Sequence, residues 1–558
     1  MQSVLRQFAV NCDGGAEPDE LLELPGSAFT VSGATRSVSL RRLWLDTFDW
    51  RLYHAGLTLE QISSRGATEL VLTGRDGAVL AADHVVRQPQ AGGAGHDGAD
   101  GRDGADGREG ADGPDGADGR QRREGGRARW PGGLDALPLG PLRDHLGPVV
   151  GVRALLPVAR AVSSVHDSRV LNSDDKTIAR VTVDRMSVSY PAAGTVPPRL
   201  AVTALRGYQP QVLRLIELLA AAPEVTDASQ SGLEAALAAV GRRPGDYSSK
   251  INVWLAPRMP ASAALTTVLT ALLDTLEANV NGTVRDLDTE FLHDLRIAVR
   301  RTRSALKLAG DALPDGLAAW FGPEFKWLGD LTTPTRDLDV YLLGFSGMAA
   351  SLTAATPDEL EPFHDHLRRS RASAQRLLVR GLRSARFSRI TGDWRQALTA
   401  AAAGRARPTA ARLASSRIAR AHRRVIRDGS AITATSPPES LHELRKRCKE
   451  LRYLLEFFGS LYDPGEHWRT VRDLKALQDC LGEFQDTQVQ HEELRAFATQ
   501  MMAERSAPAA TLLAMGEIAA GLAGTQQRAR GEFAGRFHDF ASPDGQSRFR
   551  VLTGIAAA

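Results

Sequence analysis

Hydrophobic and polar residues follow two different patterns along the chain. In the first 208 residues, short apolar runs rich in β-branched and aromatic side chains are separated by turn residues, which predicts β-strands. From residue 209 onward, apolar residues recur every three or four positions, which predicts helices. The clearest predicted strands cover residues 28–31, 39–45, 69–73, 177–184 and 200–205, and the clearest predicted helices cover residues 209–221, 232–239, 262–280, 290–309, 360–385, 409–428, 441–459 and 471–499.

These patterns predict a multidomain protein, with an α+β region followed by an all-α region. A chain of 558 residues is long enough for two or more domains, each with its own core. We expect an α+β domain at residues 1–208, a helical connector and linker at 209–260, a helical domain at 261–540 and a C-terminal tail at 541–558. The linker is placed before residue 261 because Pro257 and Pro260 interrupt any regular pattern there.

A low-complexity segment at residues 91–133 lies inside the first domain. Glycine recurs at every third position from Gly98 to Gly119, which is a collagen-like period, but Pro114 is the one proline within that run. A stable triple helix needs many more prolines. The composition therefore favours a solvated, disordered insertion in a surface loop over a trimerisation segment.

The helical region contains an internal repeat with a constant offset of 149 residues. The segment that begins at Leu292 returns at Leu441, and the correspondence continues for some 45 residues. A constant offset over that length implies two copies of one helical unit. The matching polar pairs are His293 with His442, Arg296 with Arg445, Arg300 with Lys449, Arg303 with Arg452, Lys326 with Lys475, Asp330 with Asp479, and Asp337 with Asp486.

The first four of these pairs place one imidazole and three cations on one side of each helix. Their offsets of 0, 3, 7 and 10 residues fall within about 80° of arc on a helix. Two more basic stripes occur between the repeats. One comprises Arg369, Arg376, Arg380 and Arg383, and the other comprises Arg417, Arg420, Arg424 and Arg427.

Charge is distributed unevenly along the chain. The net charge is only +3, yet residues 363–452 hold 22 Lys and Arg against 6 Asp and Glu, a local charge of +16. Such an excess indicates a polyanionic partner. Proteins that bind nucleic acid without sequence preference usually add aromatic side chains for base stacking. The aromatic residues of this region, Phe363, Phe387 and Trp394, are not among the stripe residues, which favours a ligand without bases.

Other features limit the class of protein. Three cysteines, Cys12, Cys448 and Cys480, are too few and too scattered for a disulfide framework or a zinc site. We find no apolar run of 18 residues and no secretory signal at the N-terminus, so the sequence predicts no membrane partner and a cytoplasmic location. The abundance of Ala, Arg and Gly suggests a GC-rich bacterial genome.

The repeat carries a resemblance to a known family. The motifs are Leu441-His442-Glu443-Leu444-Arg445, then Leu451-Arg452-Tyr453, then the run Leu477 to Asp486. In this order they resemble the CHAD family, the conserved-histidine α-helical domain, over roughly residues 261–540. The resemblance implies two pseudo-symmetric four-helix bundles that bind inorganic polyphosphate along a basic surface.

The two repeated histidines allow three interpretations. They could be metal ligands, but only the repeated aspartates are available as companions. They could be core histidines with satisfied hydrogen bonds, because they border the apolar face. They could contact phosphate together with the neighbouring cations, which the resemblance favours. The aspartates are better suited to orienting basic side chains or capping helices than to holding metal.

The N-terminal region carries a second resemblance. The run Trp44 to Leu52, followed by Ala55-Gly56-Leu57-Thr58-Leu59, resembles the CYTH family of triphosphate-tunnel enzymes. In that family an early strand carries Glu-x-Glu-x-Lys, which holds a divalent metal and the triphosphate. Here Ser3, Leu5 and Gln7 occupy those positions. The resemblance therefore implies an antiparallel CYTH-like β-barrel that lacks the groups for phosphoryl transfer.

These observations lead to one functional prediction and two alternatives. We predict non-catalytic binding of inorganic polyphosphate, without cofactor, catalytic residue or metal, in the cytoplasm and at polyphosphate granules. The alternatives are a metal-dependent inorganic triphosphatase in the CYTH-like domain and nonspecific nucleic-acid binding. The predicted contacts are His293, Arg296, Arg300, Arg303, Lys326, His442, Arg445, Lys449, Arg452 and Lys475, followed by Arg417, Arg420 and Arg424.

Overall fold

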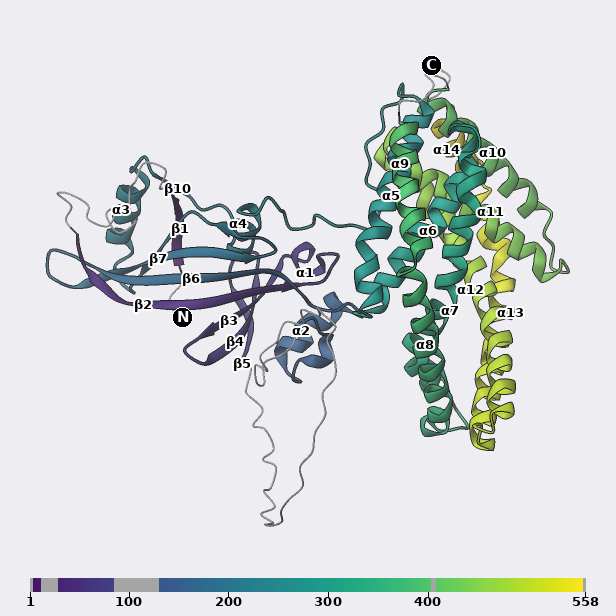
Figure 1. Cartoon of the computed structure of the whole chain (residues 1–558), viewed down its shortest axis with the longest axis horizontal. Helices are drawn as coiled ribbons and strands as arrows, with labels where there is room; N and C mark the ends of the chain where they lie inside the picture. The colour runs from purple at the N-terminus through teal and green to yellow at the C-terminus, as the bar shows by residue number, and fades with distance from the viewer. Residues whose placement is uncertain (1–3, 12–28, 85–129, 403–407, 555–558) are drawn as a thin grey trace, which may run out of the picture. The chain divides into compact units, whose positions relative to one another are not determined.

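The computed structural model describes residues 4–11, 29–84, 130–402 and 408–554. These residues belong to two compact units, Met1–Tyr247 and Ser248–Ala558 (Figure 1). The first unit contains an antiparallel sheet and the second contains helices, so the predicted order of an α+β region and an all-α region is confirmed. Most of the low-complexity insertion at 91–133 lies outside the described residues, and so does Cys12.

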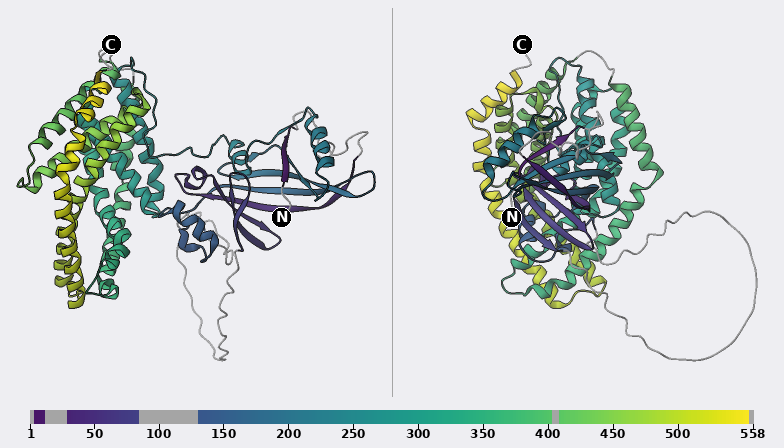
Figure 2. Two further views of the ribbon diagram at one scale, coloured as in Figure 1. Left: turned by 180° about the vertical axis from the view of Figure 1, so that it is seen from behind. Right: turned by 90° about the vertical axis from the view of Figure 1, so that its left-hand side faces the viewer.

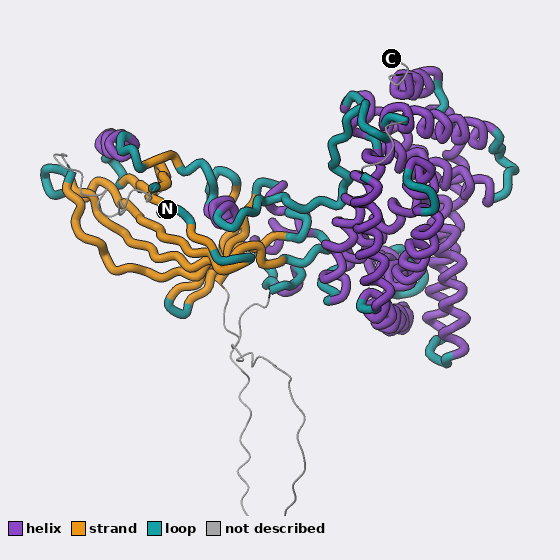
Figure 3. The backbone as a smooth tube through the Cα atoms, turned by 45° about the horizontal axis from the view of Figure 1, so that its top comes forward, coloured by secondary structure: helices purple, strands orange, loops and turns teal. Residues whose placement is uncertain are grey.

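The first unit contains one antiparallel sheet, drawn in orange in Figure 3. Its strand order is β10-β1-β9-β7-β6-β2-β3-β4-β5, and the short β8 pairs with β7. The strands are β1 (Val4–Val10), β2 (Thr30–Asp46), β3 (Leu57–Ser64), β4 (Ala67–Gly74), β5 (Val79–His84), β6 (Leu156–Leu171), β7 (Thr177–Tyr190), β8 (Gly194–Thr195), β9 (Arg199–Ala204) and β10 (Val225–Asp227).

The prediction that this sheet closes into a barrel is wrong for the described residues. The strand order has two ends, β10 and β5, and closure would require hydrogen bonds between these ends. Helices cover the two ends instead. The helix α2 (Pro141–Val150) packs Leu142 and Leu146 into the core beside β3 and β4, and α3 (Gln209–Ala220) packs Val212 into the core beside β1. Each end therefore buries its apolar side chains without meeting the other.

Three short elements after β9 also belong to the first unit. These are α3, β10 and α4 (Gly232–Ala238), and β10 pairs with β1 through Phe8 opposite Asp227. The helix α4 begins with a capping box between Ser231 and Glu234, which satisfies two backbone N–H groups. We expected residues 209–260 to form a connector, whereas the structure includes residues up to 247 in the first unit.

The second unit is helical (Figure 2). Its long helices α7, α8, α12 and α13 extend beyond the others at one end, where a separate core joins Phe345 and Phe363 to Leu494 and Met501 (Figures 1 and 2). The helices are α5 (Ala261–Val284), α6 (Thr289–Ala309), α7 (Leu317–Ala350), α8 (Glu361–Leu382), α9 (Ala385–Ala401), α10 (Ala410–Ser430), α11 (Pro438–Phe457), α12 (Pro464–Ala503), α13 (Ala509–Phe540) and α14 (Pro543–Gly554), with single 3₁₀ turns at Gly310–Ala312, Pro357–Leu360 and Gly459–Leu461.

Local sequence explains where these helices begin and why some were missed. The side chain of Asp288 accepts hydrogen bonds from the backbone of Glu290 and Phe291, which starts α6. The sequence did not predict α7, because Pro323 and Pro334 lie inside it and proline usually interrupts a helix. Residues 541–558 were expected as a tail. They include α14 instead, whose Phe549 and Leu552 are buried in the main core.

The main core of the second unit contains side chains from both sequence repeats. Leu295 and Leu328 come from the first repeat, and Leu444 and Leu477 come from the second. The helix α5 contributes many of its apolar residues to this core. It is the one described helix that is long and apolar enough to span a membrane by length and composition, and its burial here accounts for that composition.

Contacts between the repeats come in matched pairs. The backbone N–H of Ala261 donates to Pro408 at 2.9 Å, and that of Ala410 donates to Met259 at 2.8 Å. Adding or subtracting 149 turns each hydrogen bond into the other. The same shift of 149 residues relates two ion pairs, Arg301–Glu456 at 2.8 Å and Lys307–Glu450 at 2.7 Å. Exchange of this kind is what a twofold rotation produces at an interface. A pseudo-twofold axis therefore passes between α6 and α11.

Candidate anion-binding site

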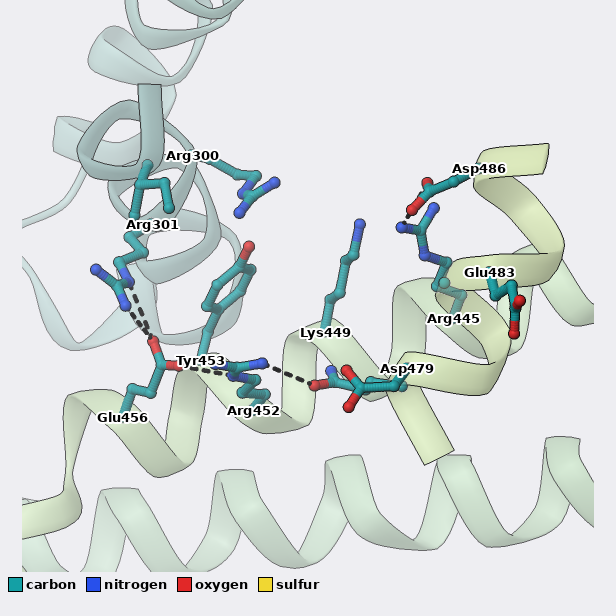
Figure 4. Close-up of a pocket in the computed structure, with 13 residues that line it drawn as sticks. Arg300, Arg301, Arg445, Lys449, Arg452, Tyr453, Glu456, Asp479, Glu483 and Asp486 are labelled. Carbon is teal, nitrogen blue, oxygen red and sulfur yellow. Dashed lines mark hydrogen bonds and ion pairs between the residues drawn. The ribbon is translucent and has the colours of Figure 1, made fainter. Parts of the chain in front are cut away.

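A cavity of about 360 Å³ lies between α6, α11 and α12 (Figure 4). Helix α6 and helix α11 place the basic stripes of the two repeats beside each other, and α12 supplies carboxylates. Four predicted contacts line the cavity: Arg300, Arg445, Lys449 and Arg452. The other lining residues are Ile297, Arg301, Tyr453, Glu456, Gln478, Asp479, Gly482, Glu483 and Asp486.

Three of the five cations in this cavity are paired with carboxylates. Arg301 and Arg452 both donate to the carboxylate of Glu456, at 2.8 Å each. Arg445 donates to Asp486 at 2.9 Å. Figure 4 shows these bonds as dashed lines at the two sides of the cavity. Tertiary folding thus brings carboxylates from other helices and other turns to these stripes.

Arg300 and Lys449 are the two cavity cations that form no ion pair among the described residues. The guanidinium of Arg300 lies over the ring of Tyr453, 5.9 Å from its centroid. Burial and, after it, the nearby charges of Arg445 and Arg300 lower the pKa of Lys449 to about 8, against an opposing effect of Asp486. Figure 4 shows the Lys449 side chain extending between Arg300 and the Arg445–Asp486 pair. Arg300 and Lys449 thus form no direct ion pair, although Asp479, Glu483 and Asp486 also line the cavity.

Two arginines of the first repeat's stripe, Arg296 and Arg303, contact α7 and do not face the cavity as their partners in the second repeat do. Arg296 donates to the carbonyl oxygen of Gly329 at 3.3 Å and to the hydroxyl of Thr333. Burial lowers the pKa of Arg296, and the charges of Arg300 and two other arginines add to that effect. The guanidinium of Arg303 lies against Gly329, where an added Cβ would be 2.8 Å from its Nη1 atom. Arg296 and Arg303 do not line the cavity, although they continue the stripe along α6.

The remaining predicted contacts lie outside the cavity. Nδ1 of His442 forms a hydrogen bond with Oε1 of Gln485 at 2.7 Å, and His293 is half-buried. Lys326 pairs with Asp330 at 2.7 Å, and Lys475 is exposed. Among the second-tier residues on α10, Arg417 pairs with Asp311, Arg420 is exposed and Arg424 is half-buried.

Sequence reasoning missed several residues that shape the cavity. Arg301, Tyr453, Gln478 and Glu483 line the cavity but were not among the predicted contacts. The signal for Glu456 was available, because it stands four residues after Arg452 on a helix, a spacing typical of ion pairs. Gln478 accepts from Arg452 at 3.3 Å, a contact between two helices that sequence spacing does not reveal.

A metal site is not found in the described part of either unit, where no group of three or more His, Cys, Asp or Glu could hold an ion. Cys448 and Cys480 are free and buried. In the first unit, Arg42 forms ion pairs with Glu60 and with Asp184, and the side chain of Gln7 accepts from Arg199 at 3.0 Å. Ser3 and the side chain of Leu5 lie outside the described residues.

Parts of this chain are similar to known proteins. The uncharacterized protein Rv2226 of Mycobacterium tuberculosis is 29% identical over 216 residues, which are 36% of this chain and 39% of that protein. The crystal structure of the CHAD domain from the plant Ricinus communis is 24% identical, with a TM-score of 0.45, and covers 52% of this chain and 96% of that one. PptA from Streptomyces chartreusis is 17% identical, with a TM-score of 0.40, and the match covers 50% of this chain and 99% of that one.

The family model described as the CHAD domain matches residues 267–495. That range includes α6, α11 and most of α12, and so every residue that lines the cavity. The helical unit of this chain therefore contains a CHAD domain at residues 267–495.

Proposed function

We propose that the CHAD domain of this protein binds inorganic polyphosphate without catalysis. The observation that carries the proposal is the pair Arg300 and Lys449, two cavity cations without an ion-pair partner among the described residues. Lys449 is half-buried and Arg300 is exposed. Keeping Lys449 charged beside Arg445 and Arg300 costs free energy unless an anion compensates. A phosphate group between them would supply that compensation.

The paired cations would take part as well. Arg301, Arg445 and Arg452 each have further N–H groups beyond those bonded to Glu456 and Asp486. Arginine donors suit phosphate oxygens because they can form two parallel hydrogen bonds. Arg296, Arg303, Lys326, Lys475, His293 and His442 extend the proposed surface beyond the cavity, and Arg417, Arg420 and Arg424 would add contacts on α10. Exposed charge contacts are worth only about 0.2–1 kcal/mol each, so tight binding would need many of them.

The aromatic side chains of the basic region favour polyphosphate over nucleic acid as the ligand. Phe363, Phe387 and Trp394 are buried and so cannot stack on bases. The matched contacts likewise support the two pseudo-symmetric four-helix bundles that the family resemblance implies.

For the first unit, we propose a CYTH-like sheet that has lost its chemistry. Its partly buried Arg42 is neutralised by Glu60 and Asp184, which leaves less positive charge for a triphosphate. We further propose that the protein acts in the cytoplasm and gathers at polyphosphate granules.

The test is a titration of long-chain polyphosphate against the double variant Arg300→Gln/Lys449→Gln. We expect its affinity to fall by about tenfold or more. The control is Arg528→Gln/Arg536→Gln, which removes two exposed cations from α13 and should leave affinity unchanged. Competition with single-stranded RNA at two salt concentrations should show a preference for polyphosphate. If the folded double variant binds polyphosphate as tightly as the parent, the proposal fails.

A further inference from the structure

A second concentration of positive charge lies on α8 and the start of α9, away from the cavity residues. Residues 366–392 contain eight arginines and no Asp or Glu. Two of these arginines are paired with carboxylates of other elements, Arg371 with Asp286 and Asp339, and Arg386 with Glu324. The other six are exposed and form no ion pair among the described residues: Arg368, Arg369, Arg376, Arg380, Arg383 and Arg389.

Four of the six form one face, which we call the α8 arginine face: Arg369, Arg376, Arg380 and Arg383. By helical geometry they lie within about 60° of one another, and Arg369 and Arg380 are about 17 Å apart along the axis. The buried residues Leu367, Leu378 and Leu382 lie on the opposite side of the helix. The α8 arginine face therefore points to solvent, and its side chains stand in a row along the helix.

Solubility alone does not account for this face. The equivalent helix of the second repeat, α13, meets solvent with both signs of charge, since residues 515–541 hold three arginines and three acidic residues. A solvent-exposed helix of this unit therefore does not need arginine as its one kind of charge. Like charges three and four residues apart also repel one another on a helix.

We propose that the α8 arginine face is a second phosphate-binding surface, which holds the part of a long polyphosphate chain that extends beyond the cavity. This inference rests on the proposed function of the cavity. A linear polyanion fits a row of cations that lacks carboxylates. The aromatic residues of α8 and α9, Phe363, Phe387 and Trp394, are buried and so cannot stack on bases. Once the cavity holds one part of a chain that is long enough to reach α8, the rest of that chain has a high effective concentration there.

The consequence is a preference for long chains. A chain too short to leave the cavity gains nothing from the α8 arginine face, whereas a long chain gains several additional contacts. The affinity difference between long and short polyphosphate should therefore depend on α8, while binding itself should depend on Arg300 and Lys449.

The experiment compares long-chain polyphosphate with tripolyphosphate on the full chain. The variant Arg376→Gln/Arg380→Gln should bind long-chain polyphosphate about tenfold more weakly and tripolyphosphate nearly unchanged. The matched control on the equivalent helix, Arg528→Gln/Arg536→Gln, should change neither. The cavity variant Arg300→Gln/Lys449→Gln should weaken both ligands. Glutamine keeps helix propensity close to that of arginine, so the variants should fold, and circular dichroism checks this.

The outcomes separate the two proposals. If the α8 variant binds both ligands as the parent does while the cavity variant weakens both, the inference about α8 is wrong and the proposed function stands. The α8 variant could instead lose the same factor in affinity for both ligands, or lose more affinity for single-stranded RNA than for long-chain polyphosphate. Either result would overturn the proposal that one polyphosphate chain binds both the cavity and the α8 arginine face. If the cavity variant changes neither ligand, the proposed function itself fails.

Discussion

Lys449 is a residue whose charge is unfavourable in the free protein. Its pKa is lowered from 10.5 to about 8 by burial and by neighbouring arginines. Below pH 8 the side chain is charged in both the folded and the unfolded chain, so the full penalty is present. Between about pH 8 and 10.5 the unfolded chain binds more protons than the folded one, so stability rises with pH across that window.

Replacing Lys449 should therefore separate stability from binding. Lys449→Met removes the charge and keeps most of the volume, so the melting temperature at pH 7 should rise by about 2–4 °C. The same change should lower polyphosphate affinity by about tenfold. Calorimetry and a binding titration on one preparation measure both effects. A variant that is less stable and also binds as tightly as the parent would contradict this account of Lys449.

The pH dependence of polyphosphate binding should reflect the titration of Lys449. A bound phosphate favours the charged form of Lys449, so binding takes up a proton when the pH is above the pKa of the free protein, about 8. Affinity for long-chain polyphosphate should therefore fall as the pH rises from 7 to 9. Lys449→Arg, which stays charged in this range, should flatten the profile. An identical profile for the parent and this variant would exclude Lys449 as the titrating group.

At the scale of the helices, the contact between α6 and α11 contains the matched pairs Arg301–Glu456 and Lys307–Glu450. Their surroundings differ. Lys307 is largely exposed, whereas Arg301 and Glu456 are mostly covered. Glu456 also neutralises Arg452, so one carboxylate serves two cavity arginines. The same group thus stabilises the helix contact and opposes the binding of an anion.

Glu456→Gln should consequently have opposite effects on folding and binding. Leaving a covered arginine without its carboxylate should lower the free energy of unfolding by about 1–3 kcal/mol, measured by urea denaturation. Polyphosphate affinity should rise, because Arg301 and Arg452 become available. The matched control Glu450→Gln leaves Lys307 and Arg447 without this carboxylate. It should destabilise the protein less, because water reaches both of these cations more easily than it reaches Arg301. Weaker polyphosphate binding by folded Glu456→Gln would show that Glu456 instead positions these arginines for the ligand.

At the scale of the whole molecule, the chain forms two units with separate cores. The cavity and the α8 arginine face both belong to the second unit. Residues 248–558 expressed alone should therefore fold cooperatively and bind long-chain polyphosphate within about twofold of the full chain. Thermal unfolding and a titration of the fragment test this. A fragment that folds but no longer binds would show that the first unit contributes to the ligand site.

The first unit should have no phosphatase activity of its own. We expect the full chain to release phosphate from tripolyphosphate, with magnesium or with manganese, at well below about 1 per second. The reason is the replacement of the metal and phosphate groups by Ser3, Leu5 and Gln7, together with the neutralisation of Arg42. Turnover in the ordinary enzyme range that disappears when residues 1–247 are removed would refute this expectation.

The sequence alone determined the order of strands and helices, the repeat and the cationic stripes, because periodicity and a constant offset are local properties that residue spacing records. Only the tertiary structure decided which of those cations keep their charge unopposed. Arg301 meets Glu456 from 155 residues away and Arg445 meets Asp486 from 41 residues away, and no spacing rule reaches so far. Barrel closure also depended on tertiary structure, because it requires β5 and β10 to meet, and helices cover these strands instead.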